Sequence, residues 1–362
     1  MGRNFVNSVR IICVSVAALL GAAAPSLASG DDGGDIDVRE IVIDHLTDSY
    51  SWHITDIGKT GIEIPLPVIV HSRESGWNVF LSSHIGHGGS HKGFYIASEG
   101  PYEGKVVETD SAGQQVRPLD ISITKNVLGI FINCTLLLLI IMPLARWYRK
   151  RGERPVPPKG FRGAVEMLLV NIHDEVIKPC VGENYRKFAP YLLTAFFFIF
   201  VSNLVGLIPF FPGGANITGN IAVTLLLAVC TFVAVNVFGT KEYWREILWP
   251  EVPSWLKVPV PLMPLVELIG VFTKPFALMI RLFANIMAGH AVILGLMCVI
   301  FVTASMGAAI STGMTALSVV FTIFMDMIEL LVAFIQAYVF TLLSSVFIGM
   351  AQVKKHEKHI TT

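Results

Sequence analysis

Charged residues are scarce in this 362-residue chain. They make up 15% of it, against about 25% in an ordinary soluble domain, while hydrophobic residues make up 53%. Mean hydropathy is correspondingly high, at +0.63. This composition excludes an ordinary soluble globular protein and predicts a membrane protein.

Motifs for nucleotides, disulfides and metals are also missing. No G-x-x-x-x-G-K-[ST] loop occurs, so we expect no ATP bound by this chain and no cofactor. The five cysteines show neither a pairing pattern nor zinc spacing, and we interpret them as core residues. His84, His87 and His91 could hold a metal, but no acidic or Cys ligand follows at regular spacing, which favours a solvated loop.

The first residues have the features of a secretory signal. Arg3 and Arg10 supply a basic start, Ile11–Ala24 a short apolar stretch, and residues 26–28 a small-residue cleavage site. The alternative is a retained transmembrane helix, for which the apolar stretch is short. We predict a signal peptide over residues 1–28.

An acidic segment follows over residues 30–121, with 15 Asp and Glu against 6 Lys and Arg. Residues 35–48 could form a short helix. Three stretches between Gly and Ser punctuation are typical of strands: Ile62–His71, Trp77–Ser83 and Gly93–Ser98. We predict a small extracytoplasmic segment of uncertain α/β structure.

The first predicted span of the mature chain is Val127–Ala145. A dense basic cluster follows it, formed by Arg146, Arg149, Lys150, Arg151, Arg154, Lys159 and Arg162. Positive charge marks the cytoplasmic side, so the acidic segment is predicted to lie outside. The next apolar residues, at helical spacing from Val165 to Val176 and ending at Pro179, predict an amphipathic helix on the cytoplasmic surface.

Four further spans follow: Pro190–Phe211, Ile221–Gly239, Pro259–Ala304 and Thr315–Gln352. The turn over 212–220 carries no charge, whereas the next loop and the C-terminal tail are basic. We therefore predict an all-α membrane protein with five spans over residues 122–362. Its mature N-terminus lies outside and its C-terminus in the cytoplasm.

The last two spans are too long to stand upright in a bilayer. About 43 helical residues reach roughly 64 Å, against a hydrocarbon thickness of about 30 Å. We expect this hairpin to tilt steeply or to kink, with Pro275 a candidate position for a kink. A steeply tilted hairpin presents a broad oblique face, which suits a large curved partner.

Six ionisable groups lie in or near this hairpin: Glu267, Lys274, Arg281, His290, Asp326 and Glu329. The first three recur every seven residues and so share one helix face, with Asn285 close to it, and Glu329 and Gln336 have the same spacing. An Arg at membrane depth costs at least about 2.5 kcal/mol. An Arg that snorkels to the headgroups, or hydrogen bonds that only pack helices, are the alternatives. The whole set favours a proton path.

These residues also carry a resemblance. The run Arg281–His290 (R-L-F-A-N-I-M-A-G-H), followed by Glu329-x6-Gln336-Ala-Tyr-Val-Phe, resembles subunit a of the F-type ATP synthase. Support extends to the stretch from Phe200 to Pro209, and the match covers residues 122–352. The family often has an acid at the His290 position and a His at the Glu329 position, so the two types are exchanged here.

The resemblance implies a stationary, non-catalytic subunit beside a rotating ring of c-subunits, each with one membrane carboxylate. Protons would reach the ring by one half-channel and leave by a second, with Arg281 between them. Asn285, His290, Glu329 and Gln336 would line the outer half-channel and Glu267 the cytoplasmic one. The implied partners are the c-ring, the b-subunit stalk and the rest of the complex in a bacterial inner membrane, without nucleic acid.

Two rival functions remain at this point. A proton-coupled secondary transporter would use similar groups, but the internal repeat and paired broken helices typical of such folds are not found. A non-conducting membrane scaffold would leave the six ionisable groups unexplained.

Overall fold

A computed structural model describes residues 48–57, 60–73, 75–86, 89–98, 100–110, 114–151, 158–208, 213–248, 262–304 and 308–352. The predicted signal peptide lies outside these residues, as does the predicted helix over 35–48 except for Asp48. The chain forms two compact units. The first comprises the chain up to Lys125 together with Gly295–Val319, and the second comprises Asn126–Leu294 and the chain from Val320.

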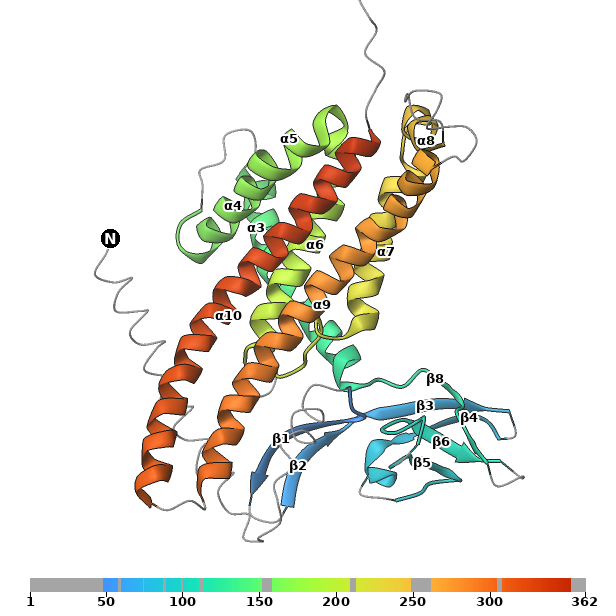
Figure 1. The fold of residues 1–362 in the computed structure, drawn as a ribbon, viewed down its shortest axis with the longest axis vertical. Helices are drawn as coiled ribbons and strands as arrows, with labels where there is room; N and C mark the ends of the chain where they lie inside the picture. The colour runs from blue at the N-terminus through green and yellow to red at the C-terminus, as the bar shows by residue number, and fades with distance from the viewer. Residues whose placement is uncertain are drawn as a thin grey trace, which may run out of the picture. The chain divides into compact units, whose positions relative to one another are not determined.

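Up to Asp120, the described part of the first unit consists mainly of short antiparallel strands (Figure 1). One sheet pairs β1 (Ser51–Ile57) with β2 (Thr60–Pro65). A second has the order β4 (Gly76–Leu81), β3 (Pro67–Ser72), β8 (Leu119–Asp120). A third has the order β5 (Phe94–Ile96), β6 (Val106–Thr109), β7 (Gln115–Val116). A 3₁₀ turn, η1 (Ser82–His84), follows β4.

The core of this unit lies on the inner side of β3 and β4. Buried side chains there are Tyr50, Val68, Val70, Phe80, Ile85, Phe94 and Val106. The Tyr50 hydroxyl donates a hydrogen bond to the Asp120 carboxylate and accepts one from the backbone N–H of Val106 at 3.4 Å. Tyr50 thereby ties β8 to β6.

The single strand predicted over Ile62–His71 is wrong, because the chain forms two strands there. Leu66 lies between Pro65 and Pro67, which lack the N–H that a sheet ladder needs. The Leu66 N–H donates a hydrogen bond to the Ser82 hydroxyl at 3.0 Å, and the Leu66 carbonyl accepts one from the Ser82 N–H at 2.9 Å. The strands predicted over Trp77–Ser83 and Gly93–Ser98 are present in shorter form as β4 and β5.

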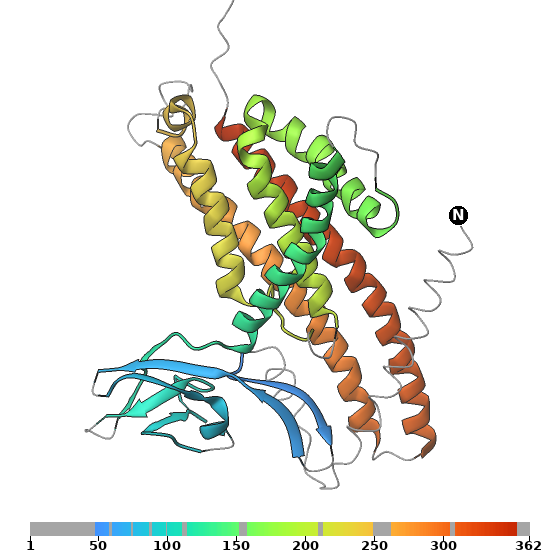
Figure 2. The ribbon, with the colours of Figure 1, turned by 180° about the vertical axis from the view of Figure 1, so that it is seen from behind.

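The second unit is helical. Its elements are α3 (Lys125–Arg151), α4 (Phe161–Asn171), the π-helical turn η3 (Ile172–Ile177), α5 (Lys178–Val181), the 3₁₀ turn η4 (Gly182–Asn184), α6 (Tyr185–Gly206), α7 (Ile221–Val237), α8 (Lys241–Leu248), α9 (Leu262–Ala304) and α10 (Ala308–Ala351). Helices α9 and α10 run through both units. They lie alongside each other in both views (Figures 1 and 2).

The predicted end of the amphipathic helix at Pro179 is wrong. Pro179 lies in the first turn of α5, where a missing N–H is tolerated. The helix ends at Gly182 instead, whose φ of 77° is a backbone conformation that suits glycine. The predicted start of the next span at Pro190 is likewise too late, since α6 begins at Tyr185 and contains Pro190 within the helix.

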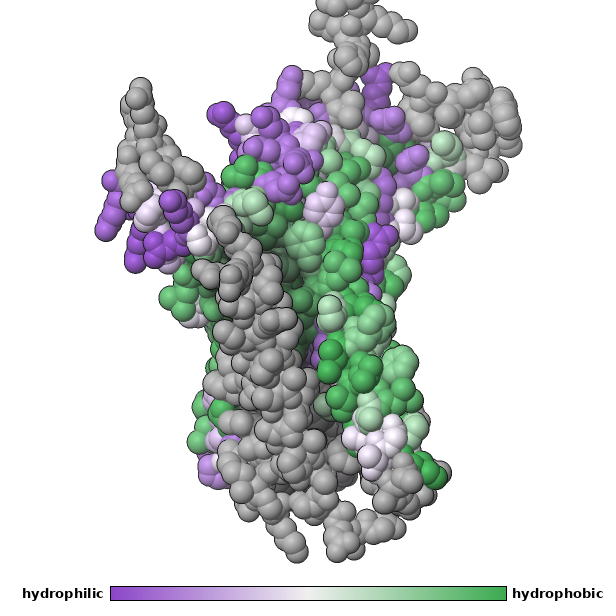
Figure 3. Space-filling model, turned by 90° about the vertical axis from the view of Figure 1, so that its left-hand side faces the viewer, coloured by the Kyte–Doolittle hydropathy of each residue, from purple (hydrophilic) through white to green (hydrophobic). Residues whose placement is uncertain are grey.

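Among the described residues, four helices are long and apolar enough to cross a membrane. The number rises to five if α7 and α8, which meet at 98°, are counted as one span. This finding confirms a multi-pass, predominantly helical membrane protein. In Figure 3, hydrophobic residues cover the middle of the helical part and hydrophilic ones gather at its upper end.

The two long helices are close to their predicted extents. Helix α9 continues through Pro275 without a break. Helix α10 begins at Ala308 rather than at the predicted Thr315, and the Thr315 hydroxyl donates to the Ser311 carbonyl at 2.7 Å within the helix. Polar contacts join α3 to α6, through Asn133 and Ser202 at 2.6 Å, and α7 to α10, through Thr231 and Ser344 at 3.2 Å.

Candidate functional site

Arg281 lies near the middle of α9, on an exposed part of the helix surface. Small exposed residues lie within two turns of it on the same helix face: Ala277, Ala284 and Ala288. Within the described part of the chain, the guanidinium has no hydrogen-bond or ion-pair partner. A permanent charge therefore lies on a surface where small side chains allow another helix to approach closely.

Glu267 and Lys274, which share a helix face with Arg281 by their spacing, are less exposed than Arg281. Lys274 is half-buried, and its Nζ lies 5.7 Å from the centre of the Phe347 ring on α10. Glu267 is also half-buried. The regular seven-residue spacing drifts around a straight helix by about 20° per repeat, so only Arg281 is exposed on the small-residue surface.

Asn285 and Gln336 meet between α9 and α10. The Asn285 amide donates a hydrogen bond to Oε1 of Gln336 at 3.2 Å. Gln336 is buried, whereas Asn285 remains exposed on the same side as Arg281. This amide pair links the Arg281 surface to the interior of the hairpin.

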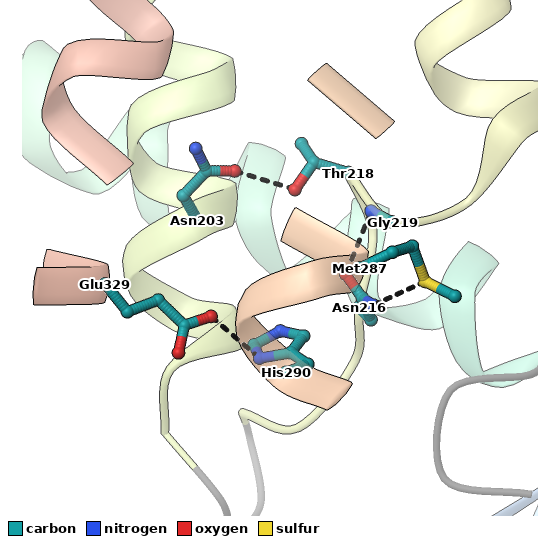
Figure 4. Close-up of polar contacts among 7 residues, drawn as sticks. All are labelled: Asn203, Asn216, Thr218, Gly219, Met287, His290 and Glu329. Carbon is teal, nitrogen blue, oxygen red and sulfur yellow. Dashed lines mark hydrogen bonds and ion pairs between the residues drawn. The ribbon is translucent and has the colours of Figure 1, made fainter. Parts of the chain in front are cut away.

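His290 and Glu329 form the second polar contact of the hairpin (Figure 4). Nδ1 of His290 lies 2.9 Å from Oε1 of Glu329, whose side chain is only 4% exposed. A proton can pass directly between imidazole and carboxylate at this distance. Asp326, one turn earlier on α10, is half-buried.

Gly289 makes room for this contact. A Cβ added there would lie 3.0 Å from Oε1 and 3.2 Å from Cδ of Glu329. A larger residue would push the carboxylate away from His290. The glycine is therefore part of the site, although it carries no side chain.

Several polar residues of the site were not predicted from the sequence. Oδ1 of Asn203 on α6 accepts a hydrogen bond from the Thr218 hydroxyl at 2.7 Å, and its amide donates to the Ala333 carbonyl at 3.3 Å. Asn216 contacts Sδ of Met287 at 3.6 Å and accepts the N–H of Gly219 at 2.9 Å. Figure 4 shows these residues around the same region as His290 and Glu329. The one available signal was the presence of Asn203 within an apolar run.

A small cavity joins these two groups of residues. Its volume is about 10 Å³, close to the lower limit for one water. Its polar lining includes Ser202, Asn203, Asn216, Thr218, His290 and Glu329. Oε2 of Glu329 is buried and has no hydrogen-bond partner among the described residues. A buried carboxylate oxygen of this kind requires a proton or a water, and the cavity provides the space.

Comparison with known proteins decides the family. Residues 128–349 match the model of a family described as ATP synthase A chain. The chain belongs to this family. The match includes α9, most of α10 and every residue of the site described above.

Individual members of the ATP synthase A chain family are similar over about two thirds of their length. ATP synthase subunit a 2 of Chlorobaculum tepidum is 44% identical, over 68% of this chain and 68% of its own. ATP synthase subunit a of Chloroherpeton thalassium is 43% identical, over 68% of this chain and 70% of its own. The subunit a of Chlorobium phaeobacteroides is 42% identical, over 66% and 67%. The predicted family is confirmed, and nothing in these matches supports a secondary transporter.

The acidic segment of residues 30–121 has a separate match. Residues 41–123 match a family described only as a domain of unknown function, DUF8433. That description gives the segment a family and leaves its role open.

Proposed function

We propose that this chain is the stationary membrane subunit that carries protons to and from a rotating ring of c-subunits in an F-type ATP synthase. The observation that carries the proposal is the exposed position of Arg281 on α9. A charge that no working pH removes lies exposed among small residues on a long apolar helix. Such a residue needs a partner of opposite charge in the membrane, and a ring carboxylate is one.

Arg281 separates the two half-channels. A ring carboxylate that arrives protonated loses its proton near the guanidinium, because the positive charge favours the ionised acid. The same charge repels a free proton and so blocks a direct leak between the two sides. The planar guanidinium can contact both carboxylate oxygens, which a Lys ammonium does less well.

His290 and Glu329 form the centre of the outer half-channel. The 2.9 Å contact between them transfers a proton. The Asn203, Asn216 and Thr218 side chains beside the cavity hold water next to Oε2 of Glu329. Asn285 and Gln336, at 3.2 Å, continue the polar line toward the surface that bears Arg281. Glu267 lies near the N-terminal end of α9 and belongs to the cytoplasmic half-channel.

The topology follows from the distribution of charge. We place five spans in a bacterial inner membrane, with α7 as the third of them, α8 in the basic cytoplasmic loop that follows, and α4 with η3 as an amphipathic helix on the cytoplasmic surface. The mature N-terminus, after a cleaved signal over residues 1–28, lies outside. The two family matches support a division between residues 30–121 and 122–362. A b-subunit stalk and the c-ring are the membrane partners, and ATP is made by other subunits.

Cross-linking tests this function through its partner. Single cysteines at Ala284 and Ala288, in a background without native cysteines, should form disulfides with cysteines placed along the outer helix of the c-subunits. Leu139→Cys on α3 is the control, since Leu139 is 67% exposed but belongs to another helix. Cross-links from Leu139 that equal those from the α9 positions would contradict a ring at the Arg281 surface.

A further inference from the structure

The outward face of the β4–β3–β8 sheet is apolar. On β4, the exposed fractions are 60% for Trp77, 64% for Val79 and 45% for Leu81. On the other edge, Leu119 is 60% and Ile121 is 56% exposed. A sheet with one solvated face normally alternates between apolar inward and polar outward residues. Here both faces are apolar.

These side chains form one continuous surface because the strand register aligns them. Ile69 of β3 lies opposite Val79, and its carbonyl accepts the N–H of Ile121 at 2.9 Å. His71 lies between Trp77 and Leu119, and its ring is 4.8 Å from the indole. Among the described residues of these strands, no Asp, Glu, Lys or Arg points outward, since Asp120 is turned inward to Tyr50. A continuous exposed patch of large apolar side chains marks an interaction surface.

The chain ties this surface to the start of a membrane helix. Only residues 122–124 separate Ile121 from α3, which begins at Lys125. That segment is itself fixed to the strands: the N–H of Ile123 donates to the Pro67 carbonyl at 3.1 Å, and that of Lys125 to the Ser49 carbonyl at 2.9 Å. A three-residue connection spans roughly 10 Å at most, so the sheet is held close to the membrane interface.

The residue types fit a lipid surface. Trp is enriched at the membrane interface, where its ring contacts acyl chains and its N–H reaches the headgroups. Val, Leu and Ile supply the apolar contact that binds an interfacial element to lipid. Asp120, the acidic residue that the structure describes on these strands, is turned inward, so the apolar contact does not depend on charged lipids.

We propose that the Trp77–Val79–Leu81–Leu119–Ile121 face is a lipid-docking surface, which lies in the outer headgroup region of the bilayer. It anchors the domain of residues 48–123 beside the membrane spans. The surface is a role for the domain of unknown function and does not depend on the proton path.

Fluorescence quenching in vesicles tests this surface with the full-length chain. Val79→Cys is labelled with an environment-sensitive dye in a background without native cysteines, then reconstituted into phosphatidylcholine vesicles that carry a nitroxide near the glycerol end of the acyl chain. Gln115→Cys is the matched control, because Gln115 is an exposed polar position of the same domain. Leu119→Cys provides a second position if the Val79 variant does not fold.

We expect lipid nitroxide to quench the label at Val79 or Leu119 at least about threefold more than the label at Gln115. Aqueous iodide should give the reverse order, and high salt should change neither, since the contact is apolar. Equal lipid quenching at all positions would overturn the proposal. A label shielded from both quenchers would also overturn it, because a protein partner would then cover the face.

Discussion

At the scale of single residues, the contact between His290 and Glu329 gives a physical reason for the exchange of residue types that the resemblance implies. What the path requires is one imidazole and one carboxylate at 2.9 Å. Two carboxylates at this distance would repel each other, and two imidazoles would disfavour the charged form. Either order of the two residues along the chain satisfies this requirement.

We therefore predict that His290→Glu and Glu329→His each strongly reduce proton-driven ATP synthesis, while the double exchange recovers a substantial part of it. The measurement is the synthesis rate in inverted vesicles at a fixed proton-motive force, with the amount of assembled complex as the control. If the double variant is no better than the worse single one, the two residues do not act as a pair.

Gly289 gives a second prediction at this scale. Gly289→Ala places a methyl group 3.0 Å from Oε1 of Glu329 and lengthens the contact with His290. Synthesis should fall by roughly tenfold, equivalent to about 1.4 kcal/mol in the barrier. Gly295→Ala on the same helix is the matched control, because its added Cβ meets no atom within 4 Å. Similar rates in the two variants would show that this close approach is unimportant.

The sequence revealed the ionisable residues of the site and the amide pair of Asn285 and Gln336, but not the polar residues of α6 and of the turn that follows it. Arg281, His290 and Glu329 could be found because ionisable groups are conspicuous in apolar runs. Asn216 and Thr218 lie in an uncharged turn, where their types are also typical of ordinary turns. Their contribution depends on α6 and the turn being packed against α9 and α10, which no local pattern encodes.

At the scale of elements, the long helices were predictable and the strands only in part. Apolar runs of about 40 residues leave little choice but helix, whereas β7 and β8 have two residues each. Proline positions were misleading in both directions. Pro179 and Pro275 lie inside helical segments, while Pro65 and Pro67 divide what reads as one strand.

Tyr50 links β8 to β6 in the domain of residues 48–123. Its ionisation limits the stability of that domain at alkaline pH. Burial raises the pKa of Tyr50, and its hydrogen bond to Asp120 raises it further. Its stabilising effect is complete below the ordinary value of about 10. It decreases above that pH, because the unfolded phenol ionises first.

We expect Tyr50→Phe to lower the stability of the domain by about 1 kcal/mol at neutral pH. Between pH 9 and 11, the variant should lose less stability than the parent protein. Protease resistance of residues 48–123 in the full chain, followed across that range, is the measurement. The same alkaline loss in both proteins would show that another group is responsible.

At the scale of the whole molecule, residues 30–121 carry a net negative charge, with 15 acidic against 6 basic residues. A negative potential on the outer side raises the local concentration of cations, and salt screens it over about 10 Å at 0.1 M. We predict that deletion of residues 35–110 slows proton uptake more at low salt than at high salt. An equal effect at both ionic strengths would indicate a role in assembly instead.

The proposed proton transport depends most on Arg281 as the barrier between two half-channels. Its most direct test is the rate of ATP synthesis at a fixed proton-motive force in inverted vesicles that carry Arg281→Ala or Arg281→Lys. We predict that synthesis falls to background in the Ala variant and is poorly restored by Lys, while ATP hydrolysis by the detached catalytic part continues. Normal synthesis with Arg281→Ala would contradict this role of Arg281.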